Sequence, residues 1–380
     1  MSINISKAKI IRMNLESNQV VGSGLIALDV VLKNEDIALY SALGGSTGNV
    51  LAILSHFGWN ASPVAHISAD SAGVSIRREF NHLGSDTSFL VNNDVISGTP
   101  VIYQWPGDDT KTHHFSFACP KCGQKRRFSD YACSHALAAE VTKKIHAPKV
   151  YYFDRVTPLS LELASIYSDR GTVIMFEPSE LNVDEADMKR AISLAHIIKY
   201  ADDRIKGLAN FDLSNVNVEI QTMGADGLRF RAPSLTLDWV DLEPINVPVI
   251  ADTAGAGDWC SAGFLYYMFN VSDNPTSQIF SHNSISNSLK FGQALSSLNC
   301  MYEGARGLMR YRSPIYILRA AHALKKDRDC LEKSDRQVKG ELNRMHHYFK
   351  EVINKKYIKN RFIKNPNLCC EPIEFMSFSK

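Results

Sequence analysis

Apolar and polar positions follow two alternating rhythms along the chain. NQVVGSGLIALDVVL (residues 18–32) opens with a short apolar run that reaches a Gly-Ser-Gly turn, which predicts a buried strand. In GGSTGNVLAILSHFGW (residues 44–59) the apolar positions have helical spacing, and we expect Ser46 or Thr47 to cap the helix. Residues 61–84 repeat the order of a strand followed by a helix.

The strand–helix order resumes after residue 148 and continues to residue 268. Regular alternation of this kind is typical of a mostly parallel sheet with helices on its faces, so we expect an α/β fold. Between the two blocks, residues 96–117 predict an antiparallel hairpin that turns at Pro106-Gly107-Asp108-Asp109. From about Ser313 onward the pattern becomes helical and contains few residues that break helices.

The composition is that of a globular protein. Of the 380 residues, 45% are hydrophobic and 22% are charged, which provides ample apolar material for a large core. The first residues contain no apolar signal-peptide core, and no run of about eighteen apolar residues occurs that could span a membrane. Eight cysteines in such a chain favour a reduced, cytoplasmic setting over a disulfide framework.

Charge is distributed unevenly along the chain. The net charge of +2 does not by itself indicate a polyanionic partner, so binding to nucleic acid is not expected. Residues 311–380 nevertheless hold sixteen Lys or Arg and eight Asp or Glu, a net +8, so the preceding 310 residues carry −6. This basic extension is either a solvated helical face or an arm that binds a partner or nucleic acid.

The stretch ADTAGAGDWCSAGFLYYM (residues 251–268) carries the most informative chemistry. A strand-like segment, INVPVIAD (residues 245–252), leads through small residues into an amphipathic helix. Small residues let backbone N–H groups approach an anion closely, and a helix N-terminus adds unpaired donors and a favourable dipole. Asp258 lies at this N-terminus, where a carboxylate is either a helix cap or a general base for a hydroxyl that attacks phosphorus.

DTAGAGDWCSAG closely resembles the DTxGAGDxFxxG signature of the PfkB (ribokinase-like) family of sugar and nucleoside kinases. Five further segments resemble elements of this family in the expected order: GSGLIALD, GGSTGNVLAILSHFG, ISADSAG, QTMGADG and FGQALSSLNCMYEGARG. The resemblance covers about residues 20–310. It implies a ribokinase-like fold, with a mostly parallel central sheet flanked by helices and a small β-sheet lid.

The resemblance also assigns roles to individual residues. It implies ATP-dependent phosphorylation of a primary hydroxyl on a sugar or nucleoside, with Asp258 as the general base. It implies an anion hole formed by the backbone N–H groups of Gly255, Ala256 and Gly257. The implied substrate contacts are Asp29, Gly45 and Asn49, and the implied nucleotide contacts are Thr222, Gly224, Gly227 and Gln293.

Cofactors and assembly follow from the same resemblance. ATP and Mg²⁺ are implied, and many members of the family use K⁺ near the loop, so K⁺ is an open expectation. The lid, expected at about residues 30–43 and 96–118, would close over the substrate and exclude water. Lids of this family often mediate dimerisation, which makes a homodimer an expectation. We expect the kinase core over residues 1–310 and a basic, mainly helical extension over residues 311–380.

Two departures from the family pattern leave a second function open. An Asn-x-x-Glu element that helps organise Mg²⁺ is replaced by a segment with Asp202, Asp203 and Arg204. A D-x-N-x-R segment is replaced by FEPSE, which contains Glu177. The first difference favours a catalytically weak relative that binds a sugar or nucleoside phosphate as a sensor or regulator, whereas the intact Asp258 and its glycines oppose this alternative. The second difference leaves the substrate unspecified.

A cysteine-rich insertion over residues 119–135 lies outside the family signature. Its candidate metal ligands are Cys119, Cys122, Cys133 and His135. Their C-x₂-C-x₁₀-C-x-H spacing suits tetrahedral Zn²⁺, and a redox pair or unligated thiols are the alternatives. We expect a structural zinc ion that holds the base of the lid.

Overall fold

The computed structural model describes residues 18–34, 37–92, 98–105, 114–126, 135–179, 183–205, 208–233, 236–270 and 279–327. The strands of its large sheet are β1 (Gln19–Ser23), β4 (Asn60–Ile67), β5 (Leu90–Asn92), β8 (Val150–Phe153), β9 (Val173–Phe176), β10 (Ile197–Ala201), β11 (Val218–Thr222), β12 (Leu228–Ala232) and β13 (Thr236–Leu242). Within these residues the sheet has the order β13-β12-β11-β10-β9-β8-β1-β4-β5. All neighbouring strands from β5 to β11 pair in parallel, and β12 and β13 extend one edge in antiparallel pairing.

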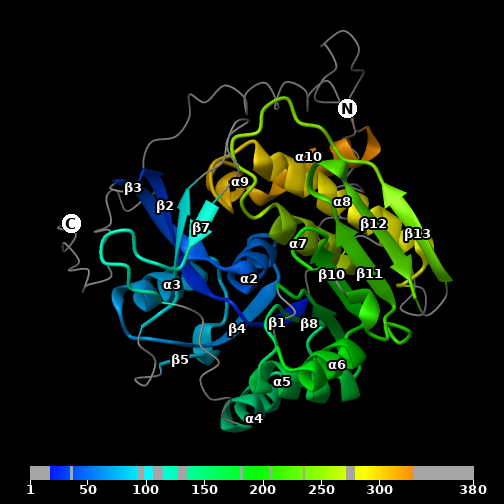
Figure 1. Cartoon of the computed structure of the whole chain (residues 1–380), viewed down its shortest axis with the longest axis horizontal. Coiled ribbons are helices and arrows are strands. Elements are labelled where there is room, and N and C mark those ends of the chain that lie inside the picture. The colour runs from blue at the N-terminus through cyan, green and yellow to red at the C-terminus, as the bar shows by residue number, and fades with distance from the viewer. Residues whose placement is uncertain are drawn as a thin grey trace, which may run out of the picture.

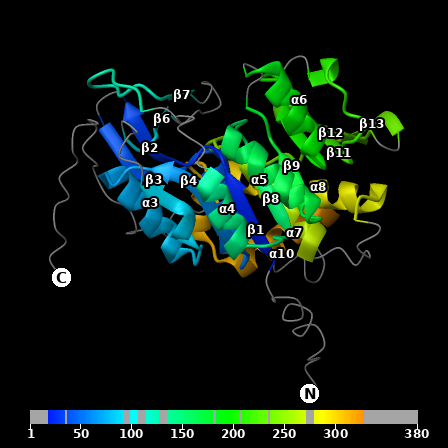
Figure 2. The ribbon, with the colours of Figure 1, turned by 90° about the horizontal axis from the view of Figure 1, so that it is seen from below.

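Helices cover both faces of this sheet. They are α2 (Ser46–His56), α3 (Ser71–His82), α4 (His135–Lys144), α5 (Pro158–Asp169), α6 (Glu185–Leu194), α7 (Ala256–Asn270), α8 (His282–Cys300), α9 (Gly307–Tyr311) and α10 (Pro314–Lys326). Figure 2 shows α4, α5 and α6 on one face, where they pack side by side. On the other face α7 packs against both α2 and α8, and α8 packs against α10.

The two faces of the large sheet have separate hydrophobic cores. Successive residues of a strand face opposite sides of a sheet, so neighbouring apolar residues enter different cores. Val20 lies in the core formed with α2, α7, α8 and α10, and Val21 lies in the core formed with α4, α5 and α6. Tyr152 and Tyr151 on β8 divide in the same way. The predicted fold, a mostly parallel sheet between two layers of helices, is confirmed.

A second, smaller sheet stands apart from the first. It consists of β2 (Ala27–Asn34), β3 (Ile37–Gly44), β6 (Val101–Trp105) and β7 (His114–Ser116), in the order β3-β2-β6-β7. Figure 1 shows it at one side of the molecule, with β12 and β13 at the other. Its strands occupy the two segments expected to form a lid, and α3 packs against β2 and β3. The predicted turn at residues 106–109 lies outside the described residues.

Two local predictions are wrong. Residues 245–252 form no strand; Pro244 and Pro248 have no N–H group to give to a sheet, and the side chains of Val249 and Ile250 are exposed. Neither Ser46 nor Thr47 caps α2. The helix begins after Gly45, which has no side chain, and the Thr47 hydroxyl donates instead to the backbone oxygen of Ser23 and to Asp154.

The C-terminal end of the described chain is helical, as expected. Helix α10 follows Ser313, and its apolar face buries Ile317 and Leu324 against α8. Residues 328–380, which hold most of the predicted basic extension, lie outside the described residues. In the part of the chain that the structure describes, no helix is both long and apolar enough to cross a membrane.

Helices α7 and α8 cross at two glycines. A Cβ atom on Gly292 would lie 2.5 Å from the carbonyl oxygen of Cys260, and one on Gly263 would lie 2.9 Å from the Cα of Gly292. These neighbours are backbone atoms, which cannot rotate away as the end of a side chain can. The close crossing therefore fixes how α7, and the loop before it, sits on the sheet.

We predict that Gly292→Ala lowers the free energy of unfolding by about 1–3 kcal/mol, because the two helices must separate to admit a methyl group. Urea denaturation measures this change. Asn287→Ala, at an exposed position of the same helix, is the control and should change stability by less than about 0.5 kcal/mol. Equal stability of the two variants would contradict the close crossing.

Candidate functional site

The glycine-rich loop before α7 forms the start of that helix. Trp259 N–H donates to the carbonyl oxygen of Gly255 at 2.9 Å, whereas Ala256 N–H turns to Thr253 at 3.2 Å. No described residue accepts a hydrogen bond from the N–H groups of Gly255, Gly257 or Asp258. The first N–H groups of a helix lack intrahelical partners and attract anions. Gly255 and Gly257 thus remain candidate donors to an anion, while Ala256 is already engaged.

Gly255 and Gly257 differ in what constrains them. Gly255 has a φ of 72°, and a Cβ there would lie 2.3 Å from the carbonyl oxygen of Ala305. Gly257 is exposed, and the nearest atom to a Cβ there would be Nζ of Lys199 at 3.5 Å. The fold therefore requires glycine at position 255, but it leaves space for a side chain at position 257.

The loop is held by the segment that precedes α9. Asp252 accepts hydrogen bonds from Ala254 N–H at 3.0 Å and from Gly304 N–H at 2.8 Å. The indole of Trp259 donates to the carbonyl oxygen of Ala305 at 2.9 Å. Both ends of the loop are thus attached to residues 304–305, which limits its movement.

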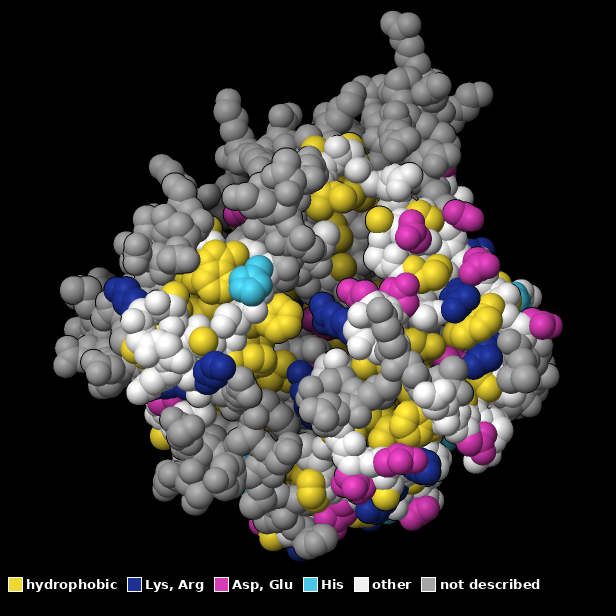
Figure 3. Space-filling model, in the orientation of Figure 1, with side chains coloured by type: hydrophobic (Ala, Val, Ile, Leu, Met, Phe, Trp, Pro, Cys, Tyr) yellow, Lys and Arg dark blue, Asp and Glu magenta, His cyan; other side chains and the backbone are white. Residues whose placement is uncertain are grey.

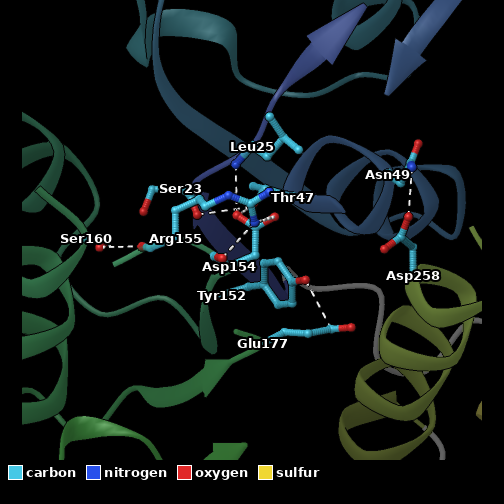
Figure 4. Close-up of polar contacts among 10 residues, drawn as sticks. All are labelled: Ser23, Leu25, Thr47, Asn49, Tyr152, Asp154, Arg155, Ser160, Glu177 and Asp258. Carbon is cyan, nitrogen blue, oxygen red and sulfur yellow. Dashed lines mark hydrogen bonds and ion pairs between the residues drawn. The ribbon is translucent and has the colours of Figure 1, made fainter. Parts of the chain in front are cut away.

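Asp258 faces α2 across the site. The amide Nδ2 of Asn49 donates to Oδ2 of Asp258 at 2.8 Å, as Figure 4 shows. The other end of the same amide, Oδ1, accepts from Nε of Arg306 at 3.0 Å. The structure therefore brings together Asp258 and Asn49, two residues far apart in the sequence that were predicted to share a site.

A buried ion pair lies beside Asp258. The ammonium of Lys199, which is 2% exposed, contacts Oε1 of Glu177. The hydroxyls of Tyr152 and Ser261 donate to Oε2 of Glu177 at 3.1 Å and 2.5 Å. Burial alone would lower the pKa of Lys199, but the nearby negative charge of Glu177 raises it overall, so the lysine stays charged.

The pKa of Asp258 is raised to about 8. Burial is the main cause and the negative charge of Glu177 the next, while the hydrogen bond from Asn49 and the charge of Lys199 act in the opposite direction. Part of the Asp258 surface still reaches solvent. A carboxyl in this state holds a proton at neutral pH and releases it slightly above, which suits proton exchange with a bound hydroxyl.

Asp154, which the sequence analysis did not single out, also contacts the start of α2. It follows β8 and is 1% exposed; its Oδ1 accepts from Leu25 N–H at 2.8 Å and from the Thr47 hydroxyl at 2.9 Å (Figure 4). Its Oδ2 lies 3.2 Å from Nη1 of Arg155. This carboxylate engages the Thr47 hydroxyl, which was expected to cap α2, and the Gly48 N–H in the first turn of that helix donates instead to the backbone oxygen of Leu25. An acidic residue directly after the apolar strand VYYF was the available signal.

The remaining predicted substrate residues lie near the start of α2. Asp29 is 4% exposed on β2, where it pairs with Ala42 of β3. A Cβ on Gly44 would lie 2.1 Å from Oδ1 of Asp29, so only glycine fits beside this carboxylate. Gly45 has a φ of 77° and is the residue from which α2 begins. Between the small sheet and the rest of the molecule the surface is hollowed, and charged side chains of both signs line the hollow (Figure 3).

The predicted nucleotide residues lie around the end of β11. Thr222 donates its hydroxyl to the Tyr200 backbone oxygen at 3.3 Å, and Gly224 and Gly227 have φ values of 58° and 91° in the turn to β12. Gln293 donates Nε2 to the backbone oxygens of Leu242 and Glu243 at 3.3 Å and 3.1 Å. Its amide nitrogen therefore holds the end of β13.

Metal ligands are sparse in the described part of the chain. Nowhere among these residues do three or more His, Cys, Asp or Glu side chains gather as a metal site would require. Asp202, Asp203 and Arg204, the segment where the resemblance leads one to expect a magnesium element, are exposed after β10. Protein sites for Mg²⁺ commonly supply only one or two carboxylates and leave the rest to substrate phosphates.

The cysteine-rich insertion is described only in part. Residues 118–125 form a tight turn in which Cys119 N–H donates to Gln124 and Gly123 N–H donates to Cys119. Cys119 is buried and Cys122 is exposed. Cys133 and the side chain of His135 lie outside the described residues, so zinc binding stays a prediction.

Comparison with known proteins finds similarity in structure only. No protein-family model matches the chain, and no curated protein matches it. Among solved structures, the ribokinase of Giardia lamblia is similar, with a TM-score of 0.64 and 13% identity over 82% of this chain and 99% of that one. The fructokinase of Xylella fastidiosa with bound ATP has a TM-score of 0.61 and 15% identity, over 82% and 99% of the two chains.

A third similar structure is the aminoimidazole riboside kinase of Salmonella enterica in complex with aminoimidazole riboside and an ATP analogue. Its TM-score is 0.58 at 17% identity, over 80% of this chain and 100% of that one. All three similarities extend over nearly the whole of the compared protein. The chain therefore has the ribokinase-like fold.

Proposed function

We propose that this protein transfers a phosphoryl group from ATP to a primary hydroxyl of a sugar or nucleoside. The observation that carries the proposal is the position of Asp258. A carboxyl group with a pKa of about 8 lies in the first turn of α7, directly beside backbone donors that can bind a phosphate. The similarity of the fold to ribokinase and fructokinase supports the same reaction class.

In this proposal each group has a separate task. Asp258 takes the proton of the substrate hydroxyl as that oxygen attacks the terminal phosphorus of ATP. The N–H groups of Gly255 and Gly257 stabilise the negative charge of the transferring phosphoryl group. Asp29 and Asn49 hold the substrate, and the turn between Thr222 and Gly227 lies against the nucleotide.

The proposal extends to metal ions and assembly. Mg²⁺ would arrive with ATP and neutralise charge on its phosphates, since the described residues contain no ready-made cage for it. Dependence on K⁺, a zinc ion in the cysteine-rich insertion and a homodimer through the small sheet stay predictions. The small sheet would act as a lid that excludes water from the reacting phosphate.

A second candidate function is the binding of a phosphorylated sugar or nucleoside without turnover. Protonated Asp258 could donate a hydrogen bond to such a phosphate at neutral pH, and Arg204 replaces an acidic residue of the family's magnesium element. This alternative retains the anion site but needs no general base, so the two functions differ in what Asp258→Asn does.

We predict that purified protein transfers label from [γ-³²P]ATP to one or more members of a panel of sugars and nucleosides. The rate should rise as the pH passes through about 8 and level off above it, because Asp258 accepts a proton only when it is deprotonated. Asp258→Asn should lower kcat about a thousandfold. If label transfer survives this substitution undiminished, Asp258 is not the base, and binding without any transfer would favour the second function.

The two glycines of the loop provide a matched pair of variants. Gly257→Ala should fold with nearly unchanged melting temperature, since the fold has space for its methyl group, yet kcat/KM should fall at least about tenfold because that methyl group covers the anion site. Gly255→Ala should instead lower the melting temperature, because of its positive φ and its contact with Ala305. Full activity of Gly257→Ala would rule out the proposed anion hole.

A further inference from the structure

We propose that Arg306 is a positioning residue that connects the small sheet to Asp258. Its guanidinium orients the amide of Asn49 toward that carboxyl and at the same time holds strand β3 at Leu43. The role of Asp258 as a general base rests on the proposed function, whereas its positioning by Arg306 can be measured in a protein that has no kinase activity.

The contacts of Arg306 reach three separate elements. Its side chain is 4% exposed and lies at the start of α9. Nε donates to Oδ1 of Asn49 on α2 at 3.0 Å, and Nη2 donates to Oε1 of Glu79 on α3 at 2.7 Å. Nη2 also donates to the backbone oxygen of Leu43 on β3. One buried side chain therefore spans α2, α3 and β3.

The guanidinium determines which way the Asn49 amide faces. An asparagine amide has an oxygen that accepts and a nitrogen that donates, whereas arginine can only donate. Oδ1 of Asn49 must therefore face Arg306, which leaves Nδ2 to face Oδ2 of Asp258. The opposite orientation would place an N–H group against the Arg306 cation, which is repulsive, and an amide oxygen against Asp258, which is repulsive once that carboxyl is deprotonated.

Glu79 and Arg306 together hold the backbone of Leu43. Oε2 of Glu79 accepts from Leu43 N–H at 2.6 Å, and Arg306 donates to the carbonyl oxygen of the same residue. Leu43 is followed by Gly44 and Gly45, where α2 begins. A displacement of β3 must therefore move Arg306, break its contacts, or bend the chain just before the helix that carries Asn49.

The segment that contains Arg306 touches both the small sheet and the phosphate loop. The Arg310 guanidinium lies 3.9 Å from the centre of the Tyr40 ring on β3, and a Cβ on Gly304 would lie 1.9 Å from the Tyr40 hydroxyl oxygen. The neighbouring Gly304 N–H and Ala305 oxygen bind Asp252 and Trp259, as described above. Residues 304–310 therefore connect the two halves of the site, the small sheet and the loop before α7, and we call this segment the bracket.

Several charged groups affect the pKa of Asp258, and Arg306 acts on it only through the amide of Asn49. Glu177 follows β9, Lys199 lies on β10 and Asp154 follows β8, and each acts on the Asp258 carboxyl directly. The Asn49 hydrogen bond favours the charged carboxylate and so lowers its pKa. Loss of the correct amide orientation should therefore raise the pKa of Asp258 further.

The test is a titration of Asp258 in ¹³C-aspartate-labelled protein, followed by NMR, with Asp258→Asn used to assign the signal. Arg306→Lys keeps the charge but has one donor group, which cannot serve Leu43, Glu79 and Asn49 together. We expect its Asp258 midpoint to rise by about one pH unit. Arg319→Lys, at an exposed position on α10, is the matched control and should leave the midpoint unchanged.

A double-mutant cycle separates positioning from a general structural effect. In an Asn49→Ala background, Arg306→Lys should shift the midpoint no further, because the amide through which it acts is gone. An unshifted midpoint in Arg306→Lys, or an equal shift with and without Asn49, overturns the proposal.

Further measurements keep the proposal testable if Arg306→Lys does not fold or if the protein has no kinase activity. If Arg306→Lys does not fold, Glu79→Gln, which weakens the hold on Arg306 without touching Asn49, should still raise the midpoint, and no rise would overturn the proposal. If the protein proves to have no kinase activity, the titration still decides the role of Arg306. If it is active, kcat of Arg306→Lys should fall and its acid limb should move to higher pH, with KM for ATP unchanged.

Discussion

The ion pair between Lys199 and Glu177 sets the electrostatics of the whole site. Two carboxyl groups, Glu177 and Asp258, lie close together in a place with little water, and their mutual repulsion must be offset. The Lys199 ammonium neutralises Glu177 directly, and two hydroxyls bind the second oxygen of that carboxylate. Removal of one partner from a buried pair commonly costs several kcal/mol, because an uncompensated charge remains. The pKa of Asp258 is raised mainly by burial and next by the charge of Glu177, and the charge of Lys199 offsets only part of this rise.

The parallel sheet explains why these groups meet. The carboxyl ends of parallel strands lie at one edge, where ligands of open α/β proteins bind. Asp154 and Glu177 directly follow the neighbouring strands β8 and β9, and Thr222 ends β11 at the same edge. Helix α7 places Asp258 at this edge. The close crossing of α7 with α8 restricts the position of the loop before α7. The position of Asp258 thus depends on backbone contacts between two helices, which lie outside the site itself.

The sequence predicted the local parts of this arrangement well. The strand–helix alternation predicted a parallel sheet, and the small residues around Asp258 predicted a helix N-terminus at a loop; the structure confirms both. The cap at Ser46 or Thr47 was wrong because the Thr47 hydroxyl donates to partners that are distant in sequence, the Ser23 backbone oxygen and Asp154, which follows β8. The strand at 245–252 was wrong because Pro248 interrupts the segment and Pro244 directly precedes it.

Other site residues could not be predicted from local patterns. Glu177 was noticed as a departure from the family, but its partner Lys199 lies in the middle of an apolar strand, where spacing does not reveal pairing. Arg306 and Glu79 look like ordinary residues of a loop and an amphipathic helix. Their importance comes from contacts across more than two hundred positions of the chain, such as 257 between Arg306 and Asn49.

The long separation in sequence between Arg306 and its partners has a consequence for how the protein folds during synthesis. Arg306 is synthesised long after Leu43 and Asn49, so during translation the small sheet and α2 exist without the side chain that joins them. Contacts between such distant positions are costly in loop entropy and tend to form late in folding. The two halves of the site can each take shape early, but they become one site only when the last tenth of the described chain has left the ribosome. A nascent or truncated chain that ends before residue 304 would therefore carry every residue assigned to phosphoryl transfer and still lack the bracket that aligns them.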